Sequence, residues 1–67
     1  MTNNDLAIAL GIQASVTSRY ATGKNMPSHN RIREIATITG VTFDQCAAMY
    51  LVANIKTQYG EEVLSLV

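Results

Sequence analysis

Residues 6–20 read LAIALGIQASVTSRY, and this stretch decides how we expect the chain to fold. Apolar residues recur at helical spacing before Gly11, which can end a helix by adopting a left-handed backbone. After Ile12, a second short helix is predicted from about Gln13 to Ala21. A helix that ends at glycine, a turn of three to four residues and a second helix together predict a helix-turn-helix.

The residues around this turn are of the types that such a corner requires. Ala7 is small where the second helix would cross the first, and Leu10 and Ile12 flank the turn with apolar side chains. The outer face of the second helix is short and polar or basic, which suits a DNA major groove about 12 Å wide. The residues expected on that face are Gln13, Ala14, Ser15, Ser18 and Arg19.

Helical spacing continues to the end of the chain, without strand-like alternation. Thr2 is expected to cap the first helix, Ser28 the third, and Thr42 with Gln45 forms a capping box for a fourth. Gly40 is placed to end the third helix. We expect its inward residues to be Ile32, Ile35, Ala36 and either Ile38 or Thr39. The fourth helix carries an apolar stripe, of which Leu51 and Ile55 lie either in the core or in an interface. The stripe consists of Ala48, Leu51, Val52, Ile55 and Tyr59.

The predicted fold is therefore an all-α bundle of four to five short helices in a single domain, residues 1–67. Within it, residues 2–21 are the helix-turn-helix unit, residues 28–59 the supporting helices, and residues 60–67 a tail that follows an interruption at Gly60.

Composition excludes several classes of protein. Hydrophobic residues make up 48% of the 67 residues and charged residues 15%, which argues against disorder. One Cys and one His exclude an intramolecular disulfide and a Cys/His zinc site. There is no base–nucleophile pair, glycine-rich phosphate loop or membrane-length apolar run, so we expect no enzyme, cofactor, small-molecule ligand or membrane association, and a cytoplasmic location.

The distribution of charge is more informative than its total. Five Lys and Arg balance five Asp and Glu, yet no acid occurs between Gly11 and Arg33. A local patch of this kind can attract a polyanion, although such residues also serve simply to solvate a face. The basic residues of this stretch are Arg19, Lys24, Arg31 and Arg33, with His29, which is expected at the surface.

These residues, taken in order, resemble the Cro/CI-type (XRE family) helix-turn-helix proteins of phages and bacteria. The resemblance covers roughly residues 2–53 and lies in the spacing of about ten positions across two helices and two turns. The matching segments are Leu6-Ala7-x-x-Leu10-Gly11-Ile12, Ser15, Ser18-Arg19-Tyr20, Gly23-Lys24, Pro27, Ile35-Ala36 and Gly40-Val41-x-Phe43-Asp44.

The resemblance implies a lambda-repressor-like fold and contacts with double-stranded operator DNA. Gln13 can bond adenine and Arg19 can bond guanine or a phosphate, and Ala14, Ser15 and Ser18 lie beside them. Either Gln13 or Arg19 can equally be an ordinary surface residue. The residues expected to contact phosphates are Asn3, Asn4, Lys24, Asn25 and Arg31, whereas Arg33 either does the same or pairs with an acid.

Two departures from the family pattern leave questions open. Thr17 stands where the family buries an aliphatic residue, so either Thr17 is buried with its hydroxyl bonded to a carbonyl, or Val16 takes that place. The family's usual first helix is lacking ahead of Thr2, and we expect the groove left beside the first helix to be filled by residues 55–67 or by a partner. The residues expected in dimer contacts or packing are Ile55, Tyr59, Val63, Leu64 and Leu66.

The expected function is that of a Cro-like phage or prophage repressor that binds operator half-sites as a homodimer, with no enzymatic role. The alternative is a protein-interaction module on the same fold, such as an anti-repressor or an antitoxin-like partner, that binds another regulator. Tyr20 is expected to pack inward, and Cys46 to be exposed but inert.

Overall fold

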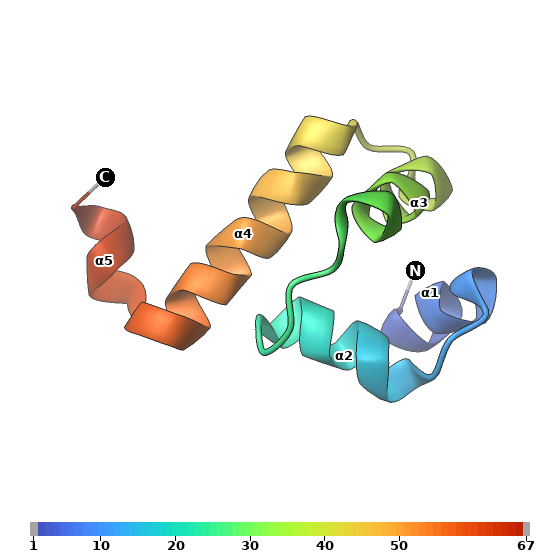
Figure 1. Cartoon of the computed structure of the whole chain (residues 1–67), viewed down its shortest axis with the longest axis horizontal. Coiled ribbons are helices and arrows are strands. Elements are labelled where there is room, and N and C mark those ends of the chain that lie inside the picture. The colour runs from blue at the N-terminus through green and yellow to red at the C-terminus, as the bar shows by residue number, and fades with distance from the viewer. Residues whose placement is uncertain (1, 67) are drawn as a thin grey trace.

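The computed structural model describes residues 2–66, which form five α-helices and no strand (Figure 1). This confirms the predicted all-α class. The helices are α1 (Asn3–Leu10), α2 (Ala14–Thr22), α3 (His29–Thr39), α4 (Phe43–Tyr59) and α5 (Glu61–Ser65).

The predicted caps define the helix ends. The Thr2 hydroxyl accepts from the Asp5 amide at 3.1 Å, while the Asp5 carboxylate accepts from the Thr2 amide at 3.1 Å. Thr42 and Gln45 form the same reciprocal pair at the start of α4. Gly11 ends α1 with a φ of +70°, in the left-handed region that glycine tolerates best. These bonds satisfy backbone groups that a helix end otherwise leaves unpaired.

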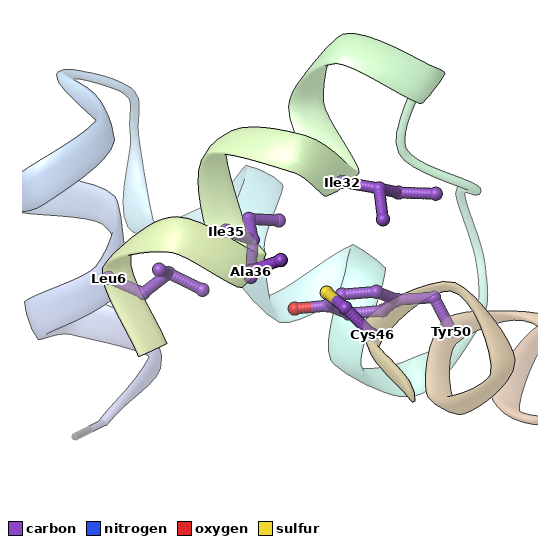
Figure 2. Packing of buried hydrophobic residues seen from close by; sticks show 6 residues of the cluster. All are labelled: Leu6, Ile32, Ile35, Ala36, Cys46 and Tyr50. Atoms are coloured by element: carbon purple, nitrogen blue, oxygen red, sulfur yellow. The ribbon is translucent and has the colours of Figure 1, made fainter. Parts of the chain in front are cut away.

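The core forms where α1, α3 and α4 meet (Figure 2). Inward packing of Ile32, Ile35 and Ala36 in α3 is confirmed. The expectation of an exposed Cys46 is wrong, because its side chain is only 1% exposed. The buried apolar cluster consists of Leu6, Ile32, Ile35, Ala36, Cys46 and Tyr50.

The apolar stripe predicted for α4 does not lie in the core, so the interface alternative for Leu51 and Ile55 stays a prediction. Leu51, Val52 and Tyr59 are 50%, 42% and 71% exposed. The helix instead buries Cys46 and Tyr50. Residues of this second set, with Phe43 and Ala47 partly buried beside them, recur at the same three- and four-residue spacing. Because both faces of α4 are apolar, periodicity alone does not determine which face turns inward.

The tail does not pack against α1, where it was expected. Over residues 2–66, α5 packs against α4 and against no other helix, and it lies at the end of the molecule opposite α1 (Figure 1). The 17-residue α4 carries the tail away from the N-terminal helices. Leu6 is buried against the core and Leu10 packs beside it, whereas Ile8 on α1 is 73% exposed. The alternative of a partner chain beside α1 stays a prediction.

Within residues 2–66, no single helix is long and apolar enough to cross a membrane. Helices α3 and α4 reach that length and hydropathy only when taken together, and they are bent by 116°.

Candidate nucleic-acid interface

The outer side of α2 carries the residues predicted to contact bases. Gln13, the N-cap residue, makes no side-chain capping bond and is exposed, so the helix starts one residue later than predicted. Ala14, Ser15, Ser18 and Arg19 are exposed as well. Successive residues of a helix are 100° apart, which places Ser15 and Ser18 on one face with Thr22, one turn farther along. Thr22 was not among the residues predicted for this face, although its helical spacing from Ser15 and Ser18 indicates that it lies there.

Thr17 is the buried residue of α2, and the hydrogen bonds of its hydroxyl explain how a polar side chain can be buried there. The side chain is 1% exposed. Its Oγ1 lies 2.8 Å from the carbonyl of Asn3 and 2.9 Å from that of Ala14, and it donates toward both. The structure thus favours the first of the two predicted alternatives, with Val16 only partly buried. The contact with Asn3 ties α2 to the start of α1 and fixes which side of α2 turns outward.

The C-terminal end of α2 is held by α4. Gly23 has a φ of +80°, and a Cβ at this position would overlap the Ala53 carbonyl oxygen. The Asn54 Nδ2 donates to the Gly23 carbonyl at 3.0 Å, and the Thr57 hydroxyl donates to the Thr22 carbonyl. The sequence prediction did not find this contact, because it joins residues more than 30 positions apart.

Aromatic packing adds a second link between α2 and α4. The rings of Tyr20 and Tyr50 meet edge to face with centroids 6.3 Å apart, which agrees with the inward packing expected for Tyr20. Burial raises the pKa of the Tyr50 hydroxyl, and the neighbouring Cys46 and Tyr20 raise it further. Burial also raises the pKa of the Cys46 thiol, which keeps it protonated and poorly nucleophilic.

The basic residues near α2 differ in whether their side chains form ion pairs or hydrogen bonds. Arg19 and Lys24 are exposed, and neither forms an ion pair within residues 2–66. Arg31 is partly buried and lies 3.6 Å from the Glu34 carboxylate, a pair of the kind worth about 0–1 kcal/mol. Arg33, for which an acid partner was one alternative, instead hydrogen-bonds the His29 ring at 2.9 Å.

The other predicted phosphate contacts flank α2. Asn3 and Asn4 occupy the first turn of α1, which the Thr17 bond holds against α2, and Asn25 follows α2 with its amide bonded to the Arg19 carbonyl at 3.3 Å. Asp5 lies in the same turn of α1, and its hydrogen bonds with Thr2 lower the pKa of its carboxyl. This negative charge opposes a phosphate at the α1 N-terminus.

The residues predicted for dimer contacts fall into two groups. Ile55, Val63 and Leu64 are half-buried, whereas Tyr59 and Leu66 are mostly exposed.

No group of three or more His, Cys, Asp or Glu side chains in residues 2–66 is placed to hold a metal ion. Comparison with protein-family models, with curated proteins and with solved structures found no match to the chain.

Proposed function

We propose that the chain is a sequence-specific, double-stranded DNA-binding transcriptional regulator, a Cro-like phage or prophage repressor that acts as a dimer on operator DNA. One observation carries the proposal. Helix α2 follows α1 after a three-residue turn, is braced at both ends, and presents an acid-free outer face of short polar side chains. This is the arrangement by which a recognition helix enters a major groove.

The side chains on this face match the chemistry of base edges. Gln13 projects from the N-cap of α2, the end of a recognition helix that contacts bases, and its amide can bond adenine in bidentate fashion. Arg19 can bond guanine or a phosphate. The small residues Ala14, Ser15 and Ser18 allow the backbone to approach the floor of the groove.

Electrostatics support a polyanionic ligand at this face despite the zero net charge. Arg19 and Lys24 have no ion-pair partner among the described residues, and the acid nearest in sequence after Lys24, Glu34, is paired with Arg31. Asp44, Glu61 and Glu62 lie on α4 and α5, whereas Asp5 lies in the first turn of α1, beside α2, and opposes a polyanion there. We expect about 4–6 phosphate contacts per dimer and a modest salt dependence.

Repression would be steric. A dimer that occupies two half-sites about 34 Å apart excludes polymerase or a competing regulator from the operator. In this proposal the loop after α2 makes the main phosphate contacts, Asn3 and Asn4 contribute less because Asp5 lies in the same turn of α1, and α2 reads the bases.

Fluorescence anisotropy with the DNA upstream of the chain's own coding sequence tests this proposal. We expect salt-dependent binding that Arg19→Ala weakens at least ~10-fold, with a log–log salt slope reduced by about 1 per subunit. Lys56→Ala removes the same charge from the end of α4 and is the matched control. Equal effects of the two variants, or no binding tighter than ~10⁻⁶ M, would contradict the proposal.

A second function, an interaction module that binds another regulator, is favoured by one specific observation. Ile8 is 73% exposed on α1, on a side that the tail leaves uncovered. In that case Ile8→Glu would abolish binding to the partner regulator, whereas Gln13→Ala and Arg19→Ala would leave it unchanged. Loss of DNA binding in the latter two variants, with none in Ile8→Glu, supports the DNA-binding proposal instead.

A further inference from the structure

A cavity of about 420 Å³ lies between the C-terminal half of α3 and the N-terminal half of α4. Its volume is within the range of about 300–1,000 Å³ that small-molecule sites occupy. None of the side chains that line it within residues 2–66 is charged, which suits an apolar molecule better than an ion. Beside Tyr50, the cavity is lined by Ile35, Thr39, Val41, Gln45, Cys46 and Met49.

Tyr50 brings a polar group to this cavity. Its side chain and that of Cys46 extend from α4 toward α3, the two helices that form the cavity (Figure 2). Tyr50 is only 6% exposed, yet its hydroxyl makes no hydrogen bond within residues 2–66. No side-chain oxygen or nitrogen of the buried and partly buried residues in that range is both unpaired and sealed from solvent. The Tyr50 hydroxyl is therefore accessible, and the cavity that Tyr50 lines gives a ligand that access.

The other polar side chains of the cavity are engaged with the backbone. The Thr39 hydroxyl donates to the Ile35 carbonyl at 2.7 Å. The Gln45 Oε1 accepts from the Thr42 amide at 3.2 Å, which leaves the Nε2 of this exposed side chain to donate. The two groups that remain for a ligand, the Tyr50 O–H and the Gln45 N–H, are both donors. A ligand that matches them carries an oxygen acceptor.

We propose that this cavity binds a small, uncharged molecule with an apolar body and a carbonyl oxygen that accepts from the Tyr50 hydroxyl. An apolar lining with a few polar groups that orient the ligand is the usual composition of such sites. The sequence alone predicts no small-molecule ligand, because the lining residues come from two helices and form no local motif. The proposal is independent of the proposed function, since the candidate DNA-binding face lies on α2.

The stability of Tyr50→Phe tests the premise that the hydroxyl is unpaired. Because the Tyr50 hydroxyl has no partner within residues 2–66, its removal should not lower the urea midpoint of the free protein. A clear loss of stability would show that the hydroxyl is already bonded inside the protein. The cavity would then offer a ligand no buried donor, and the proposal would fail.

Benzophenone, which has two apolar rings on one carbonyl, is the probe for binding, and NMR of the methionine methyl groups in the full chain is the measurement. The Met49 signal should shift and saturate with a dissociation constant of ~100 µM. Met26 is 41% exposed and does not line the cavity, so its signal should stay in place. No saturable shift of Met49, or an equal shift of Met26, would overturn the proposal.

Diphenylmethane, which has the same two rings without the oxygen, isolates the hydrogen bond. Tyr50→Phe removes only the hydroxyl, and it should shift the ratio of the two dissociation constants about 5-fold in favour of diphenylmethane. Tyr20→Phe removes a hydroxyl from a ring that does not line the cavity, so it should keep the ratio of the parent. An unchanged ratio in Tyr50→Phe, or an equal change in both variants, would overturn the assignment of the Tyr50 hydroxyl as the donor.

Discussion

Thr17 determines which residues of α2 can reach a ligand. A buried aliphatic residue would serve the same packing, but a threonine has to satisfy its hydroxyl, and the Asn3 and Ala14 carbonyls do so at 2.8 and 2.9 Å. The bond to Asn3 crosses from α2 to α1. A single side chain therefore sets both the rotation of α2 about its axis and its contact with α1.

We expect Thr17→Ala to destabilise the fold by about 2 kcal/mol, because it removes a buried methyl group and a hydrogen-bonded hydroxyl. Val16→Ala, at a partly buried neighbouring position, should cost about 1 kcal/mol or less. Urea denaturation of both variants measures the difference. A larger loss in Val16→Ala would mean that α2 is rotated from the orientation described.

Asp5 gives the fold an acid-sensitive component. Its carboxylate accepts from the Thr2 amide, which lowers the pKa below the ordinary value of 3.8. The stabilisation is complete above 3.8 and is lost as the pH falls through the lower pKa of the folded state. Denaturation at a series of pH values should show this loss in the parent and a smaller one in Asp5→Asn. Identical profiles would show that the charge of the Asp5 carboxylate contributes nothing.

At the scale of helices, capping residues and glycines predicted the helix ends well, whereas apolar periodicity predicted the buried faces less well. Helix α2 was predicted at residues 13–21 and is found at Ala14–Thr22, because caps and glycines act within one turn. The apolar stripe predicted for α4 lies outside the core. The helix has two apolar stripes, one with Cys46 and Tyr50 and another with Val52 and Ile55. Only packing against α2 and α3 decides between them.

Of the candidate interface, sequence reasoning found the exposed face of α2 but not its supports. Serine and glutamine residues follow Gly11 within a few positions, so the sequence alone predicts a polar, exposed face of α2. Asn54 and Thr57 act on the end of α2 from a helix far along the chain. Their contact follows from the close approach of two backbones at Gly23, which no local pattern encodes.

The glycines at the ends of α1 and α2 should respond differently to the same substitution. Gly11→Ala strains a left-handed backbone in open space and should cost about 1–2 kcal/mol. Gly23→Ala adds a clash with the Ala53 carbonyl and should cost at least ~3 kcal/mol. Denaturant unfolding compares the two. Equal losses would show that α4 does not hold α2 as closely as described.

At the scale of the whole molecule, the hydrophobic core is small and part of the apolar surface stays exposed. Among residues 2–66 the buried hydrophobic core has seven residues, whereas Leu51, Val52 and Tyr59 of α4 are exposed in the single chain. The dimer of the proposed function would supply stability that a core of this size lacks. The zero net charge fits the same picture, since it opposes neither pairing nor a local basic surface.

Stability should therefore depend on protein concentration. Over a 100-fold increase in concentration, the Tm of the parent should rise by several degrees, because the folded dimer is linked to two unfolded chains. A concentration-independent Tm of the parent would show that the isolated chain carries its full stability.

The central claim is that α2 reads DNA bases, and selection of duplexes from a randomised pool tests it most directly. The parent should enrich a two-fold symmetric sequence. Gln13→Ala should enrich the same sequence with the preference lost at one base pair in each half-site, where a bidentate contact is worth about 1–3 kcal/mol of discrimination. An identical sequence from both proteins, or no enrichment by the folded parent, would contradict the claim.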